Sequence, residues 1–309
     1  MNKKSILSGG ASIVGRNKRY VVWFWLMNLA LATIGSEAFS LRAHHILDQS
    51  LYSDRLVHGM DLGVFGEMLG RPEFGPLRGA ALPSMMLALL FFVLTMIFLP
   101  GVLQGYASDH RISRGEFWRA CGVNVWRFLR LTILSMIVIA IVAGVFSAIG
   151  NALGKAADAT SNERLPFFVQ LGWLAAMFLA MTIVRIWFDL AETDAVLSDQ
   201  PAVRKSLRYA VHHTRHNLVR LLGSYVLIAL VGAAVVAGGV VLWNLIVPPA
   251  SVLGAYIIAQ AIAFFFLATR FWQRAVAVSF YKSNALEDIV EFAPMIVAAA
   301  PVAADPAQL

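Results

Sequence analysis

Six side chains that can bind a metal ion or transfer protons lie close together early in the chain. They are three histidines and three aspartates: His44, His45, Asp48, Asp54, His58 and Asp61. His44 and Asp48 are four residues apart, as are Asp54 and His58, so each pair would share one face of a helix. A divalent cation or acid–base chemistry is one interpretation. We favour a folded polar cap, because the spacing matches no defined ligand pattern.

Three further histidines, at 212, 213 and 216, follow one another within a basic segment. His212 and His216 have the i, i+4 spacing that can place two imidazoles on one metal. Arg208 and Arg215 would repel a cation there, and no acidic residue or cysteine stands at a matching position. We therefore interpret the histidines as part of a basic surface and predict no metal or cofactor.

The third candidate group consists of charged side chains near the ends of two apolar segments. They are Arg185, Asp189, Glu192, Arg270 and Arg274. Ionisable groups at such depth are costly unless they are paired or hydrated. We predict that Arg185 pairs with Asp189, and that Asp189 or Glu192 pairs with Arg270 or Arg274. A gate or a lipid-headgroup site is the functional alternative.

The elements that position these residues are long apolar helices. The chain has 309 residues, of which 59% are hydrophobic and 14% are charged, whereas soluble domains are about 45–50% apolar and about 25% charged. A helix needs roughly 20 apolar residues to cross a bilayer. The sequence predicts an all-α integral membrane protein with six spans, at 20–39, 81–103, 128–149, 166–190, 218–246 and 251–271.

The basic residues predict the orientation of these spans. Nineteen of the 25 lysines and arginines fall on one side of the predicted membrane. The positive-inside rule then places both termini in the cytoplasm, and we expect a multi-pass protein of a bacterial inner membrane. This distribution also favours contact with anionic lipids over nucleic acid binding.

Each of the three predicted helical hairpins follows a basic amphipathic segment. Ser113 and Glu116 have the spacing of a capping box at the start of the second segment, and the third segment begins near Asp199. Such helices lie in the plane of the membrane interface. The candidate contacts to lipid or to a partner are Arg114, Arg119, Arg127, Arg204, Lys205, Arg208 and Arg215.

The domain organisation follows from this layout. Residues 1–19 form a cytoplasmic basic segment, and 20–282 form the membrane domain with an outer loop at 40–80. Residues 283–309 are rich in alanine and proline towards their end, which predicts a disordered cytoplasmic tail. The hairpins also share short patterns, such as Arg185-Ile-Trp187 and Arg270-Phe-Trp272, so an internal repeat remains an open alternative.

One family resemblance rests on two short stretches. Phe188-Asp-Leu-Ala-Glu192 and Ala202-Val-Arg204-Lys-Ser206-Leu-Arg208 resemble the membrane domain that is fused to some glycerophosphodiester phosphodiesterases, over residues 81–275. The resemblance implies an inner-membrane protein of unknown role. The catalytic domain of that family is absent from this sequence, so we do not expect the diesterase activity.

No nucleotide-binding loop, zinc protease motif or serine hydrolase motif occurs in the sequence. We expect a non-enzymatic membrane protein that binds anionic lipids, a protein partner or another copy of itself. One alternative is a transporter or permease subunit for a lipidic solute, with a cavity near Gln260. The other is an enzyme that uses the outer histidines and aspartates.

Overall fold

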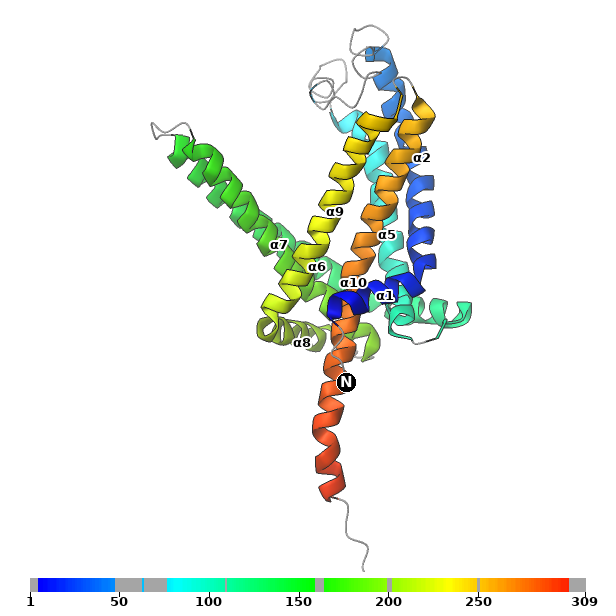
Figure 1. The fold of residues 1–309 in the computed structure, drawn as a ribbon, viewed down its shortest axis with the longest axis vertical. Helices are drawn as coiled ribbons and strands as arrows, with labels where there is room; N and C mark the ends of the chain where they lie inside the picture. Colours follow the sequence, from blue (N-terminus) through cyan, green and yellow to red (C-terminus); the bar gives the residue numbers. More distant parts are fainter. Residues whose placement is uncertain are drawn as a thin grey trace, which may run out of the picture.

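The computed structural model describes residues 5–47, 63, 77–108, 110–158, 164–198, 202–248 and 251–299, with the backbone alone at 36–47, 77–84, 157–158, 252 and 285–299. These residues form eight α-helices and no strand, which confirms the predicted all-α class. The helices are α1 Ile6–Arg16, α2 Lys18–Leu47, α5 Leu77–Ala107, α6 Arg114–Asp158, α7 Leu165–Leu197, α8 Val203–His216, α9 Leu218–Ile246 and α10 Val252–Ala299 (Figure 1).

Five helices are long and apolar enough to cross a membrane. The segments that meet this criterion are Met85–Ala107, Arg114–Ala156, Leu165–Leu197, Leu218–Ile246 and Leu253–Asn284. They overlap five of the six predicted spans. The remaining span, 20–39, falls in α2, whose side chains are described only to residue 35. Many large apolar side chains on these helices are exposed, as expected where lipid takes the place of water. By length and composition this is a multi-span membrane protein.

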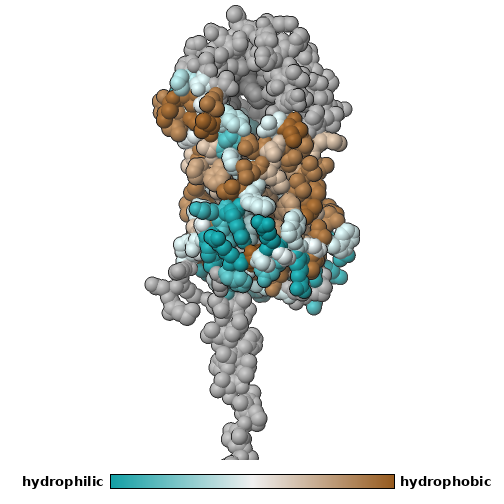
Figure 2. Space-filling view, turned by 90° about the vertical axis from the view of Figure 1, so that its right-hand side faces the viewer, coloured by the Kyte–Doolittle hydropathy of each residue, from teal (hydrophilic) through white to brown (hydrophobic). Residues whose placement is uncertain are grey.

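Two short helices lie crosswise to the long ones at one end of the molecule. In Figure 1, α1 and α8 both run across the molecule at the level of the lower ends of α2 and α9, below which α10 continues, and we call this level the α1–α8 end. From the side shown in Figure 2, hydrophilic residues gather towards this end, below a hydrophobic zone. Such a boundary between polar and apolar surface is typical of a membrane interface.

A buried or half-buried asparagine marks the step from each amphipathic segment to the long helix that follows. Asn17 separates α1 from α2, and Asn217 separates α8 from α9. Asn17 Nδ2 donates to the Ile13 carbonyl at 3.1 Å, and Asn217 Nδ2 donates to the His213 carbonyl at 3.3 Å. The backbone N–H of each asparagine donates to the same carbonyl at 3.1 Å, so each asparagine closes the last turn of the preceding helix with two hydrogen bonds.

A third asparagine, Asn124, lies inside α6, where the helix continues without a break. Asn124 Nδ2 donates to the Ala120 carbonyl at 3.0 Å. The predicted capping box at the start of α6 is confirmed, because Glu116 N donates to Ser113 Oγ at 3.2 Å and Ser113 N donates to Glu116 Oε2 at 2.7 Å. The second amphipathic segment is therefore the first part of a 45-residue helix.

The residues that follow the three asparagines share one burial pattern. The residue four positions after each asparagine is buried: Val21, Phe128 and Leu221. The residue seven positions after it is buried as well: Phe24, Leu131 and Ser224. A spacing of three or four residues keeps side chains on one face of a helix, so the three long helices enter the core in the same way.

Helix α1 is held against α10 by close backbone contact. Gly10 faces Val276, and a Cβ atom at Gly10 would lie only 3.0 Å from the Val276 backbone nitrogen. The Trp272 indole nitrogen also donates to the Leu7 carbonyl at 3.1 Å. This contact joins segments that are more than 260 residues apart in the chain.

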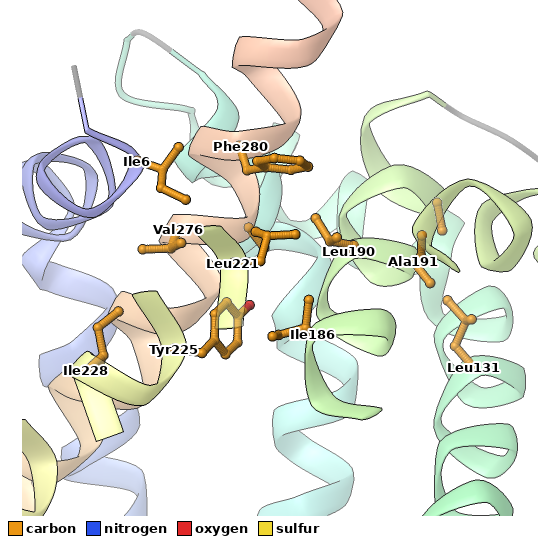
Figure 3. Close-up of a cluster of buried hydrophobic side chains, with 13 residues drawn as sticks. Ile6, Leu131, Ile186, Leu190, Ala191, Leu221, Tyr225, Ile228, Val276 and Phe280 are labelled. Carbon is orange, nitrogen blue, oxygen red and sulfur yellow. The ribbon is translucent and has the colours of Figure 1, made fainter. Parts of the chain in front are cut away.

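The larger buried cluster lies at the same end of the molecule (Figure 3). Ile6 of α1 lies beside Phe280 of α10, and Tyr225 of α9 lies between α10 and Ile186 of α7. Leu131 adds α6 to the same cluster. The helices are therefore tied together at the α1–α8 end.

The hairpin of α6 and α7 diverges from the other long helices towards the opposite end. Figure 1 shows the two helices side by side, inclined away from α9 and α10. Near the far end of the hairpin, Gly150 lies under the ring of Trp173, which also stacks on Phe146 at 4.8 Å between ring centroids. Helices α6 and α7 thus pack on each other along the hairpin. They pack on the other helices at the base of the hairpin.

Two boundaries differ from the sequence-based predictions. Helix α8 begins at Val203 with Ala202 as its N-cap, so the predicted start near Asp199 is wrong. Helix α10 continues to Ala299, so its backbone is helical over part of the predicted disordered tail. Good helix formers such as Ala285, Leu286 and Glu287 account for the continuation.

The contact between α1 and α10 leads to a stability prediction. Gly10→Ala should lower the unfolding temperature of the purified protein, because overpacking costs about 1–3 kcal/mol, whereas removing a helical glycine gains only about 0.5–1 kcal/mol. Gly15→Ala is the matched control, because a Cβ atom there meets nothing within 4 Å. Equal unfolding temperatures for the two variants would contradict the close contact.

Candidate functional site

The predicted charged residues meet where α7, α9 and α10 converge. We call Arg185, Asp189 and Glu192 of α7, Tyr225 of α9, and Arg270 and Arg274 of α10 the Asp189 cluster. The cluster lies near the α1–α8 end, because Arg274 stands only two residues before Val276, which α1 contacts.

Asp189 is the centre of this cluster, and its side chain is 7% exposed. Its Oδ2 accepts a hydrogen bond from the buried Tyr225 hydroxyl at 2.9 Å and lies 3.6 Å from Arg185 Nε. Its Oδ1 lies 4.0 Å from Arg274 Nε. The carboxylate therefore links α7 to both α9 and α10.

A second hydrogen bond joins α9 to α10 beside the carboxylate. Gln273 Nε2 donates to the backbone carbonyl of Tyr225 at 3.3 Å. Both Tyr225 and Gln273 are buried. The tyrosine is thus fixed at its side chain by α7 and at its backbone by α10.

The two α10 arginines have different surroundings. Arg274 lies within reach of Asp189, whereas no carboxylate in the described part of the chain lies within 4.0 Å of Arg270. The Arg270 guanidinium instead lies over the Phe266 ring, 5.1 Å from its centroid. Of the two partners that the sequence proposes for Asp189, the structure brings Arg274 close to it.

A cleft opens next to the cluster, between the α6–α7 hairpin and helices α5 and α10. Its volume is about 550 Å³. All five charged members of the cluster line it, and the remaining walls are mainly apolar. Gln260, near which the transporter alternative expects a cavity, is not among the lining residues.

The basic residues of α8 and of the first part of α6 form the second candidate region. Arg204, Lys205, Arg208 and Arg215 of α8 are exposed, and so are Arg114 and Arg119 of α6. Arg127 differs from them, because it donates to Asn124 Oδ1 at 3.1 Å and to the Ala195 carbonyl at 3.5 Å. It joins α6 to α7 and is only partly available to a ligand.

The histidines of α8 make contacts within their own helix. His213 Nδ1 lies 3.1 Å from the Tyr209 carbonyl, and His216 Nδ1 lies 3.1 Å from the His212 carbonyl. No group of three or more residues that could hold a metal ion occurs among the described residues. The outer-loop candidates Asp48, Asp54, His58 and Asp61 lie outside the described residues, as do the side chains of His44 and His45.

Sequence reasoning missed two parts of the site. The first is Tyr225, which lies in a strongly apolar helix. Its hydroxyl group is the feature of the sequence that could have indicated a buried hydrogen bond there, because a buried tyrosine hydroxyl usually has a partner. Thr95 of α5 lines the cleft from a distant part of the chain, and nothing in its local sequence indicates this.

No family model, no curated protein and no solved structure matches this chain. The resemblance to the membrane domain fused to glycerophosphodiester phosphodiesterases therefore stays a prediction.

The Asp189 contacts lead to a second stability prediction. Breaking a buried ion pair costs about 3–5 kcal/mol. Because Arg185 and Arg274 are 30% and 22% exposed, we expect Asp189→Asn to cost less, on the order of 2 kcal/mol. Denaturant unfolding in detergent would measure the loss.

Adding Arg274→Gln to Asp189→Asn should recover part of this stability, because the double variant removes the excess positive charge. Tyr225→Phe is the control, since it deletes one hydroxyl and should cost about 1 kcal/mol. A double variant that is no more stable than Asp189→Asn would show that Asp189 and Arg274 are not coupled.

Proposed function

We propose that this protein is a non-enzymatic membrane protein that binds anionic phospholipids at its cytoplasmic end. In this proposal α2 supplies a sixth span, and the spans form three hairpins in a bacterial inner membrane. Both termini and the α1–α8 end are cytoplasmic. The positions of the basic residues in the sequence support this orientation through the positive-inside rule.

The observation that carries the proposal is the charge distribution on α8. The helix runs from Val203 to His216 and contains no acidic residue. Four of its basic side chains are exposed: Arg204, Lys205, Arg208 and Arg215. Each basic residue near an anionic membrane surface contributes about 1 kcal/mol of attraction, so this surface favours anionic headgroups.

The packing of α8 supports the same conclusion. Its buried residues are Ser206, Ala210 and Thr214, which fall four residues apart and therefore on one face. That small-residue face is turned into the protein, which leaves the arginines outside. Because α8 lies crosswise to the long helices (Figure 1), its basic residues are spread along the plane of the interface.

The cleft favours a second candidate function, the passage of a lipidic solute between the hairpins. The cleft borders on the diverging α6–α7 hairpin, and its walls are mainly apolar. If this function is correct, the purified protein in liposomes should speed the exchange of a fluorescent phospholipid between leaflets. An exchange rate equal to that of protein-free liposomes would exclude it. Residues 48–62 and 64–76, which hold most of the outer-loop candidates of the enzyme alternative, lie outside the described residues.

The proposed function predicts a change in the lipids that surround the protein. Replacing Arg204, Lys205 and Arg208 together by glutamine should reduce the enrichment of phosphatidylglycerol over phosphatidylcholine several-fold. The lipids retained in polymer-extracted particles can be measured by mass spectrometry. High salt should weaken the enrichment of the wild-type protein, because these charges are exposed.

The matched control removes basic residues from the opposite end of the molecule. Lys155→Gln with Arg164→Gln should leave this enrichment unchanged. If the α8 variant keeps the wild-type enrichment, or if the control loses as much as the α8 variant, the proposed role of α8 is wrong.

A further inference from the structure

We propose that the cleft beside the Asp189 cluster binds one anionic phospholipid. Its phosphate would lie against Arg270, Arg185 and Arg274, and its acyl chains would follow the apolar walls. The inference rests on the lipid-binding function proposed above and goes beyond it, because it assigns a single site of defined composition.

The charge balance of the cleft favours an anion. Three guanidinium groups, those of Arg185, Arg270 and Arg274, line it together with two carboxyl groups, those of Asp189 and Glu192. With both acids ionised, one positive charge is left over. Asp189 already lies between two arginines, and Arg270 has no carboxylate within 4.0 Å among the described residues. The uncompensated charge therefore falls nearest to Arg270.

Three residues that line the cleft also carry buried hydrogen-bond donors without an acceptor. Arg185 Nε, Arg274 Nε and the Thr95 hydroxyl are buried atoms that make no hydrogen bond in the described part of the chain. The two Nε atoms lie 3.6 and 4.0 Å from Asp189, which is too far for a hydrogen bond. A buried donor without a partner is costly.

Thr95 differs from two other hydroxyl residues on the long helices, Thr182 and Ser224. Thr182 donates to the carbonyl four residues earlier at 2.7 Å, and Ser224 does the same at 2.8 Å. The Thr95 hydroxyl makes no such bond, and its residue lines the cleft. Phosphate oxygens accept strong hydrogen bonds from guanidinium groups, and three guanidinium-bearing residues, Arg185, Arg270 and Arg274, line the cleft.

The walls of the cleft fit the apolar part of such a ligand. Phe92 and Met96 of α5, Ile139 of α6, and Phe178 and Met181 of α7 line it. Phe92, Ile139 and Phe178 are each 42–43% exposed, so the apolar wall continues to the outer surface of the helices. A tail can therefore enter from the side, between α5 and the α6–α7 hairpin.

The depth of the arginines matches that of a lipid phosphate. Helix α1, which crosses the molecule at the interface, contacts α10 at Val276. Arg274 and Arg270 precede Val276 by two and six residues, which is about 3 and 9 Å along a helix. Long arginine side chains can reach towards the interface from this depth. A headgroup at the arginines and a tail along the walls is the orientation of a lipid in the adjacent leaflet.

The test titrates the full-length protein with dioleoyl phosphatidylglycerol in mild detergent and counts bound lipid by native mass spectrometry. We expect one tightly bound lipid. Arg270→Gln should weaken its binding about tenfold, because one charge-assisted hydrogen bond is lost. Ser135→Trp should weaken it by a similar factor without changing any charge, since Ser135 lines the cleft and bonds only to the Thr132 carbonyl of its own helix.

Arg130→Gln is the matched control for Arg270→Gln. Arg130 is also exposed and also lies over an aromatic ring, that of Trp126, 5.2 Å from its centroid, but it does not line the cleft. Its replacement should leave the tight binding unchanged. Wild-type affinity in both cleft variants would overturn the inference, as would an equal loss in all three. Binding of inorganic phosphate that competes with the lipid and is insensitive to Ser135→Trp would identify a free-anion site and overturn the lipid assignment.

The same titration separates this inference from the proposed function. A loss of lipid enrichment in the α8 glutamine variant, with unchanged binding in both cleft variants, would overturn the cleft site and leave the proposed function in place. Unchanged enrichment in the α8 variant, with weakened binding in the cleft variants, would overturn the role of α8 and support the cleft site.

Discussion

Asp189 carries a carboxylate that is enclosed by apolar helices. Such a group is costly unless other groups of the protein pair with it. It takes a hydroxyl from α9, one guanidinium from α7 and another from α10. Each of these partners comes from a helix that also contributes to the adjacent apolar cluster. The charge and the hydrophobic packing therefore hold the same helices together, at the same end of the molecule.

Away from that end, the helices have little physical reason to stay together. Lipid tails solvate apolar side chains about as well as other helices do, so the hydrophobic effect does not drive long helices into a solid bundle. The α6–α7 hairpin is free to diverge once its base is held by Leu131, Leu190 and the Arg127 contact to Ala195. The cleft follows directly from this arrangement, and the charged base of the cleft is the same cluster that holds the hairpin.

Asp189 and Arg274 occupy corresponding places in two similar stretches of sequence. Each stands two residues after a tryptophan and four after an arginine, in Arg185-Ile-Trp187-Phe-Asp189 and Arg270-Phe-Trp272-Gln-Arg274. The asparagines at 17, 124 and 217 are likewise followed by buried residues at the same spacings. These matched spacings fit the internal repeat that the sequence leaves open, and opposite charges at matched positions bring α7 and α10 into contact.

The sequence alone determined the elements. Apolar length and basic flanks predicted the long helices, since a bilayer admits few other structures, and the capping-box spacing of Ser113 and Glu116 predicted a helix start. Those signals are local. The tertiary structure decided three further features. Asp189 lies close to Arg274 and not to Arg270, Tyr225 contacts the Asp189 carboxylate, and Thr95 lines the cleft. They depend on how helices far apart in the chain are rotated and inclined, and no residue specifies the angle at which its helix meets another.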